Sequence, residues 1–296
     1  MKTKLFLLSI LSVFLIAGCG KSSKEKANYT MPPFVVDSHT HYGGTDAWEK
    51  SFLEVYPSHN AMACLLIDMN LLDRGIAFAK VHPDRVIPYA AIDIDSPTVV
   101  ADINKVHDMG FKGLGELFAT GRWDYNDPKY DTIWALAEQY HMGVAPHTGN
   151  LATGEMAHLR PSFLADICAK HPKLFVHAAH FGNPWYEEAA EACRRNKNLY
   201  FDMSGSSLIK KENDPHFWAQ WLWWTDAIGK AHMPKDAVPA WEKILFATDE
   251  DPDQFMENIR RFNKVLDACN VDEATRAKSY GLTIANFYGI NVPAAK

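Results

Sequence analysis

The residues Phe34-Val35-Val36-Asp37-Ser38-His39-Thr40-His41 form a short apolar run that ends in a polar segment with two histidines. Side chains two residues apart on a β-strand point to the same side, so His39 and His41 are expected to present their imidazoles together. Two neutral imidazoles at this spacing are a good start for a divalent transition-metal site. A His-x-His pair also occurs by chance in many proteins, so the other ligands must come from elsewhere in the chain.

Short apolar segments alternate with segments of helical length and periodicity after His41, which predicts repeated β-strand and helix units around a parallel sheet. The expected strands after the first are residues 61–67, 85–92, 111–117, 142–146, 174–179, 199–203 and 243–247. The expected helices are 45–56, 70–82, one opened by Ser96 and Pro97, 127–140, 161–170, 184–196, 216–232, 253–269 and 272–288. Eight strands over this length predict a single-domain α/β fold, the (β/α)8 or TIM barrel, with its active site at the carboxyl ends of the strands.

Metal-binding residue types end five of these eight strands. They are His39 and His41 on the first strand, Glu116 on the fourth, His147 on the fifth, His180 on the sixth and Asp249 on the eighth. A polar residue at the end of one apolar strand is usually only the start of a loop. The coincidence of residue type and position at five strand ends predicts a shared metal site.

Several of these segments resemble the amidohydrolase superfamily, specifically the amidohydrolase 2 branch of proteins like aminocarboxymuconate semialdehyde decarboxylase. The matching motifs are VDSHTH at 36–41, PHTG at 146–149, AHFG at 179–182, YFDMSG at 200–205 and ILFATD at 244–249. The resemblance covers nearly all of residues 31–296. It implies that His39, His41, His147 and Asp249 bind a divalent metal, often zinc, and that His180 is catalytic or a further metal ligand placed over the substrate.

Glu116 departs from the simplest one-metal pattern. In some binuclear relatives a carboxylate on the fourth strand bridges two metals, which would make two ions per chain; otherwise Glu116 contacts the substrate or hydrogen-bonds a ligand. Strand alternation places it on the face of Lys112 and Leu114, which is expected to point into the barrel. His177 has the opposite parity to His180 and is expected to face the outer helices.

The expected site supports two reactions on a small molecule. Three imidazoles and one carboxylate leave a metal room for water, and bound zinc lowers the pKa of water to roughly 7. Asp249 could then take the proton of the attacking water while His180 polarises a carbonyl, which predicts hydrolysis of an ester, lactone or amide. With an aromatic or unsaturated carboxylic acid, the same site could support decarboxylation. A binding lipoprotein without catalysis is a third interpretation, but all four expected ligands are present.

Weaker signals concern the substrate and the oligomeric state. Arg122 and Arg160 follow the fourth and fifth strands, where a guanidinium could bind a substrate carboxylate, although loop arginines are usually solvated. The tryptophans at helical spacing within 216–232 favour a helix packed on the barrel. Alternatively, some of them line an aromatic pocket or an interface between identical subunits.

The first 30 residues are expected to lie outside the fold. Residues 1–18 have a basic start, a short apolar run and small residues, as in a secretory signal, and Ile16-Ala17-Gly18-Cys19 resembles the bacterial lipobox. This predicts cleavage before Cys19, lipid on its sulfur, a flexible tether over 19–30, and an exported protein anchored by lipid to a membrane of the bacterial cell envelope. An ordinary cleaved signal with a chance cysteine is the alternative.

The charge of the chain argues against nucleic acid as a partner. The net charge is −6, and removal of residues 1–18, with Lys2 and Lys4 and no acidic residue, makes it −8. The chain is acidic, and its sequence contains no basic cluster that could neutralise phosphates. The four remaining cysteines have no CxxC spacing and are expected to be buried thiols.

Overall fold

The computed structural model describes residues 31–119, 121, 123–151, 155–225, 231–233 and 238–292. The predicted signal segment 1–18, Cys19 with the tether 19–30, and Arg122 lie outside these residues. Within the part of the chain that is described, no helix combines the length and apolar character needed to cross a bilayer.

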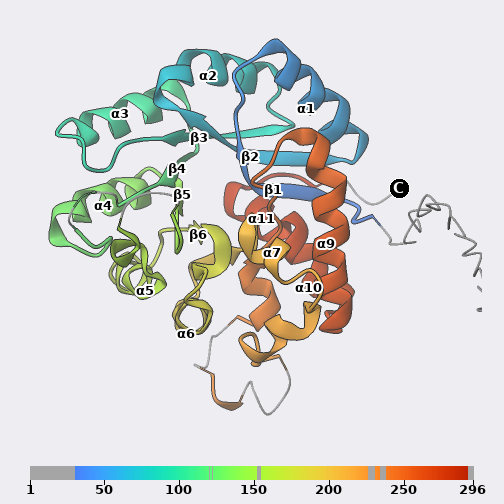
Figure 1. Ribbon diagram of the computed structural model, residues 1–296. Coiled ribbons are helices and arrows are strands. Elements are labelled where there is room, and N and C mark those ends of the chain that lie inside the picture. The colour runs from blue at the N-terminus through green and yellow to red at the C-terminus, as the bar shows by residue number, and fades with distance from the viewer. Residues whose placement is uncertain are drawn as a thin grey trace, which may run out of the picture.

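Eight parallel strands form one sheet in chain order (Figure 1). They are β1 (Val35–His41), β2 (Ala61–Asp68), β3 (Val86–Ala91), β4 (Gly113–Leu117), β5 (Gly143–Pro146), β6 (Val176–Ala178), β7 (Leu199–Asp202) and β8 (Ile244–Leu245). The segment around β8 returns to β1: the Ser38 amide donates to the Phe246 carbonyl at 2.9 Å, and the Asp249 amide donates to the His39 carbonyl at 2.7 Å. The barrel is therefore nearly closed, as predicted.

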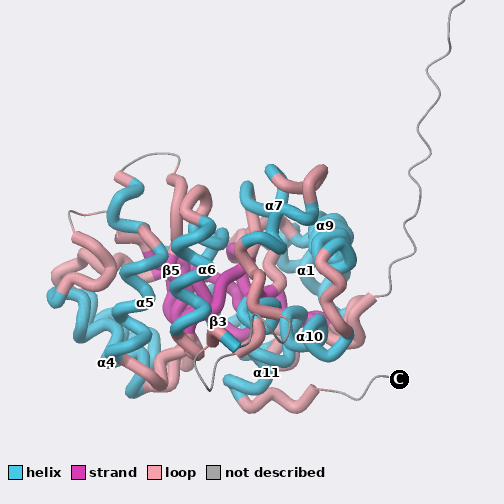
Figure 2. The backbone as a smooth tube through the Cα atoms, turned by 90° about the horizontal axis from the view of Figure 1, so that it is seen from below, coloured by secondary structure: helices cyan, strands magenta, loops and turns pink. Residues whose placement is uncertain are grey.

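Helices surround the strands (Figure 2). They are α1 (Asp46–Ser58), α2 (Leu72–Val81), α3 (Val99–Met109), α4 (Asp131–Gln139), α5 (Pro161–Lys170), α6 (Tyr186–Arg195), α7 (Ser206–Lys210), α9 (Phe255–Ala268), α10 (Glu273–Ala277) and α11 (Thr283–Tyr288). A π-helical turn, Lys278–Leu282, joins the last two. The helix after β3 begins at Val99, with Thr98 rather than Ser96 at its N-cap.

The predicted helix over 216–232 is wrong for its described first part. Pro215–Gln220 is a 3₁₀ helix, and residues 221–225 form turns and irregular backbone. The ring of Trp218 packs edge-on against Phe181 and Tyr186, with centroids 5.8 and 5.3 Å away. The helical spacing of the tryptophans thus reflects aromatic packing from a compact loop, not one face of a long helix.

Apolar side chains form two layers on either side of the strands. The outer layer packs between strands and helices, and the inner layer fills the barrel with residues such as Val36, Cys64, Tyr89 and Leu245. Helix α11 completes the inner layer with Ile284 and Ala285. The turn before it approaches β1 so closely that a Cβ on Gly281 would lie 2.8 Å from the Val36 nitrogen, which explains glycine there.

His177 lies inside the barrel, so the prediction that it faces the outer helices is wrong. Its neighbours Val176 and Ala178 belong to the outer layer, and its own Nε2 lies 2.8 Å from the Tyr89 hydroxyl. Strand β6 ends at Ala178, and a 3₁₀ turn follows. The alternation of side chains therefore stops before His180 and cannot be extrapolated back from it.

Candidate active site

An irregularity in β1 turns its two histidines into the barrel. Val35 belongs to the outer layer and Val36 to the inner layer, so regular alternation would point His39 outward. The register between β1 and β2 shifts between Asp37 and Thr40, where β1 has one residue more than its partner strand. Such a bulge reverses the alternation and places His39 and His41 on the inside.

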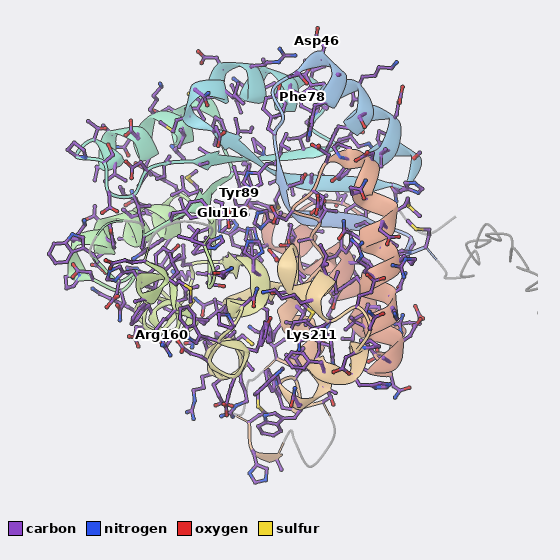
Figure 3. All side chains as sticks on the ribbon, viewed as in Figure 1. Asp46, Phe78, Tyr89, Glu116, Arg160 and Lys211 are labelled. Carbon is purple, nitrogen blue, oxygen red and sulfur yellow. The ribbon has the colours of Figure 1, made fainter. Side chains whose placement is uncertain are left out.

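A second irregularity turns Glu116 inward. Leu114 lies in the outer layer, so the premise that Leu114 and Glu116 share the inner face is wrong. The register between β4 and β5 shifts between Gly115 and Leu117, and the Glu116 carboxylate lies among histidines in the barrel, with only 5% of its side chain exposed. Figure 3 shows Glu116 near the middle of the molecule.

Four donor atoms face one another at the ends of β1, β4 and β8. The Nε2 atoms of His39 and His41 are 3.3 Å apart. The Glu116 Oε2 lies 3.6 and 3.5 Å from them, and the Asp249 Oδ1 lies 3.4 and 3.6 Å from them. Two ligands that share a tetrahedral zinc ion at about 2.0–2.2 Å lie roughly 3.3–3.6 Å apart. The spacing and chemistry of this donor set therefore fit one divalent metal ion.

The other oxygen of Glu116 faces a second group of donors. Its Oε1 lies 2.6 Å from the His147 Nδ1 and 3.6 Å from the His180 Nε2. The Nε2 of His147 faces the Asn150 carbonyl oxygen at 3.1 Å. Both nitrogens of His147 thus face oxygen acceptors.

The structure therefore divides the predicted ligands differently from the one-metal expectation. His39, His41 and Asp249 lie together, as that expectation requires. His147 contacts the opposite oxygen of Glu116 and belongs with His180. Glu116 contacts both groups through its two oxygens, and His180 also lies within ligand distance of His39 and Asp249.

Asp202 is a residue of this site to which the sequence reasoning gave no role. Its Oδ2 lies 3.2 Å from the His39 Nδ1, and its Oδ1 accepts hydrogen bonds from the His180 amide at 3.0 Å and from the Ser204 amide and hydroxyl. A carboxylate on Nδ1 holds the Nδ1–H tautomer of His39 and leaves the lone pair of Nε2 for a metal. Its place at the carboxyl end of β7 was the signal that could have revealed it.

A buried aspartate beneath the site links the first strand of the barrel to the segment that follows the last strand. Asp37 accepts hydrogen bonds from the Tyr56 hydroxyl at 2.7 Å, from the Thr248 hydroxyl at 2.7 Å and from the His39 amide at 3.1 Å. Burial raises the pKa of Asp37 to about 6, although the hydrogen bonds from Tyr56 and Thr248 oppose this rise. These bonds fix β1 against the residue that precedes Asp249.

The electrostatics of the site favour positive charge. Burial alone would lower the pKa of His39, but the carboxylates of Glu116, Asp249 and Asp202 raise it to about 10. Burial acts to raise the pKa of Glu116, but His39 and the hydrogen bonds from His147 and His180 hold it well below its usual range. Burial also opposes ionisation of Asp202, yet its bond with His39 lowers the pKa to about 2. A divalent cation would satisfy the same demand for charge.

Two sharp turns aim site residues at the barrel axis. His180 and Phe181 after β6 and Asp249 after β8 have φ angles of 65°, 46° and 53°. Residues other than glycine rarely adopt this left-handed backbone region, and those that do are concentrated at functional sites. The Asp202 carboxylate accepts from the His180 amide, and the Ser207 hydroxyl donates to the His180 carbonyl at 2.6 Å, so the first turn is held from both sides.

The guanidinium of Arg160, predicted to bind a substrate carboxylate, is paired with another residue of the chain. It forms a two-pronged ion pair with Glu188, and its guanidinium lies 4.8 Å from the centre of the Trp185 ring. Glu188 also accepts from the Ser162 amide at 2.9 Å, which ties Arg160 to the start of α5. These contacts describe a structural role for Arg160.

A family model matches most of the chain. The model, described as Amidohydrolase (Amidohydro_2), matches residues 61–290. A search of curated proteins found no match.

Several solved structures share this fold at low sequence identity. An uncharacterised TIM-barrel protein from Bordetella bronchiseptica is 16% identical, with a TM-score of 0.62 over 86% of this chain and 98% of the other. A probable 2-pyrone-4,6-dicarboxylic acid hydrolase from Acinetobacter baumannii is 13% identical, with a TM-score of 0.57 over 86% and 99%. A dihydroxybenzoic acid decarboxylase from Polaromonas, solved with bound manganese, is 14% identical, with a TM-score of 0.56 over 87% and 97%. These likenesses establish the barrel.

Proposed function

Because this chain belongs to the amidohydrolase family, we propose that it is a metal-dependent enzyme that hydrolyses an ester, lactone or amide bond in a small molecule. The observation that carries the proposal is the position of Glu116, whose Oε2 faces His39 and His41 while its Oε1 faces His147 and His180. Sites with two neighbouring metal ions are common in hydrolytic enzymes. We assign one ion to His39, His41, Glu116 and Asp249. We assign a second ion to Glu116, His147 and His180.

The roles that we assign to Asp249 and Glu116 follow from the exposure of their side chains. A divalent metal held by these residues would polarise a substrate carbonyl and make a water molecule acidic enough to attack it. We assign proton transfer to Asp249, because 26% of its side chain is exposed whereas Glu116 is buried. Asp249 would take the proton of the attacking water and return it to the leaving group.

His180 has a role that depends on the number of ions. Its Nδ1 lies 3.3 Å from the Ser204 carbonyl oxygen, so a proton on Nδ1 leaves the Nε2 lone pair as a ligand for the second ion. If only one ion is held, protonated Nε2 would donate a hydrogen bond to the oxyanion that develops on the substrate. Metal stoichiometry therefore decides between the two roles.

Decarboxylation is a second candidate, favoured by the aromatic wall of the site. The Phe118 ring stacks on the His147 imidazole with centroids 4.9 Å apart, a surface that suits an aromatic acid. The similar structures include a probable hydrolase and a decarboxylase, so the fold itself does not choose between the two reactions. On an aromatic acid the site residues would hold the carboxylate while a protonated residue delivers a proton to the ring carbon.

Metal analysis followed by a substrate screen tests these proposals. We expect about two divalent ions per chain by elemental analysis, zinc being our first expectation and manganese the alternative found in a similar structure. Glu116→Gln should lower the content to one ion or fewer, whereas the exposed control Glu54→Gln should not. Full metal content in a folded His39→Ala, His41→Ala variant would refute the site.

The screen separates the two reactions. Esters, lactones and carboxylated aromatics are supplied with and without added metal, and water-dependent products and carbon dioxide are both measured. Carbon dioxide release without a hydrolytic product would replace hydrolysis with decarboxylation. Absence of both reactions in the fully metal-loaded protein would favour the binding lipoprotein.

We further propose that the mature protein starts at Cys19 and carries lipid there, so that residues 31–296 act at a membrane surface of the cell envelope. The lipobox-like segment at 16–19 supports this proposal. The substrate would then be a small molecule outside the cytoplasm.

A further inference from the structure

A cavity of about 450 Å³ lies at the end of the barrel opposite to the candidate active site. Its walls include Val86 and Ile87 at the start of β3, and Phe111 and Met142 just before β4 and β5. Glu116 and His147, by contrast, lie where β4 and β5 end. The cavity is therefore separate from the metal-binding groups.

The size and walls of this cavity, which we call the lower cavity, suit a small apolar molecule. Small-molecule sites usually measure about 300–1,000 Å³ and are mostly apolar. Ile76 and Ala79 of α2, Met62 of β2 and Ile290 near the end of the chain add further apolar surface. A ligand there would remove this surface from water.

Positive charge distinguishes the lower cavity within an acidic chain. Its lining contains Lys80, Lys112, His107 and His141 but neither aspartate nor glutamate, although the net charge of the chain is −6. The His107 Nδ1 lies 3.3 Å from Asp108, and the His141 Nε2 faces a backbone carbonyl at 3.0 Å. Lys80 and Lys112 are exposed, and neither forms an ion pair within the described residues.

The two tyrosine hydroxyls of the wall, those of Tyr140 and Tyr288, already have hydrogen-bond partners. The Tyr288 hydroxyl lies 2.6 Å from the Tyr89 hydroxyl, 2.9 Å from the Lys112 carbonyl and 3.2 Å from the Gly143 amide. These partners exhaust its hydrogen-bonding capacity. The two ammonium groups are thus the charged features that an anionic ligand of the lower cavity would meet.

We propose that the lower cavity binds an apolar monocarboxylate, with its hydrocarbon part against Ile76, Phe111 and Met142 and its carboxylate toward Lys80 and Lys112. Burial of the hydrocarbon supplies affinity, and the lysines select the anion over a neutral molecule of the same length. The site is independent of the reaction proposed above, because it contacts none of the metal-binding residues.

Calorimetric titration with decanoate tests this site. We expect saturable binding of one decanoate per full chain. The Lys80→Met, Lys112→Met variant should bind about tenfold more weakly or worse, because charge-assisted hydrogen bonds are lost. The control Lys50→Met, Lys105→Met removes the same charge from exposed positions elsewhere and should bind like the parent. Decan-1-ol should bind the parent more weakly than decanoate.

A chemical footprint locates the ligand without any substitution. The parent is acetylated with and without decanoate, and modification of each lysine is measured by mass spectrometry. We expect decanoate to protect Lys80 and Lys112 but not Lys50. Absence of saturable binding, equal affinity of the Lys80→Met, Lys112→Met variant, or absence of protection would each overturn the proposal, whatever the catalytic screen shows.

Discussion

Replacement of Asp202 by asparagine should weaken metal binding without touching a metal ligand. Asp202 holds His39 from behind: its Oδ2 lies 3.2 Å from the His39 Nδ1, while its Oδ1 accepts three hydrogen bonds from His180 and Ser204. The three donors around Oδ1 keep an oxygen at that position in Asp202→Asn. The new amide group must then face the Nδ1 of His39.

The expected magnitude follows from the tautomer of His39. A donor opposite Nδ1 favours a proton on Nε2, and protonated Nε2 cannot bind a metal. Loss of such carboxylate support typically weakens metal binding by about 10- to 100-fold, or roughly 1.4–2.7 kcal/mol. The hydrogen bonds to Oδ1 remain, so the fold should be retained.

Competition with a chelator of known affinity measures this effect. Parent, Asp202→Asn and the exposed control Asp214→Asn are titrated with the same metal, and circular dichroism verifies that all three are folded. We expect only Asp202→Asn to bind more weakly. A folded Asp202→Asn protein with an affinity within about twofold of the parent would refute this account of how Asp202 supports His39.

Three other variants test separate parts of the chain. Arg160→Met should lower the free energy of unfolding by about 1 kcal/mol, because its ion pair with Glu188 is partly exposed, and should leave kcat/KM unchanged; a rise in KM in steady-state kinetics would instead indicate substrate contact. Burial lowers the pKa of Lys243 to about 8 in the folded protein, against 10.5 in the unfolded chain. Between these pH values the unfolded chain binds the extra proton, so stability should rise with pH, by up to about 3 kcal/mol. Denaturant titrations should show that Lys243→Met removes this rise and that Lys50→Met keeps it. Cys19→Ser should move the protein from the detergent phase to the aqueous phase, and unchanged partitioning would refute the lipid anchor.

The barrel could be predicted from the sequence because its strands are short, apolar and regularly spaced. Five of the strands also carry metal-binding residue types at or near their ends, so the rule that strand ends converge brought His39, His41, His147, His180, Asp249 and Glu116 to one place. The order of strands in the sheet then followed from the fold class. Only the limits of the strands differ, as at β8, where the expected 243–247 is reduced to Ile244–Leu245.

Side-chain directions were harder to predict, because they depend on single inserted residues. A register shift reverses the alternation in β1, and another reorients Glu116 in β4; neither leaves a mark in the sequence pattern. His177 was assigned to the wrong face because the turn before His180 interrupts the alternation. The grouping of His147 with His180 likewise depends on how the two oxygens of Glu116 are oriented. The spacing of residues along the sequence does not reveal that orientation.

The position of α11 affects when the protein can finish folding. Ile284 and Ala285 complete the inner layer, and Gly281 lies against β1, so a segment that follows all eight strands packs against the first one. We expect nascent chains that end before residue 283 to leave Tyr89 and the apolar interior of the barrel open at one end. Closure of the barrel therefore waits for a segment that lies far along the chain from β1.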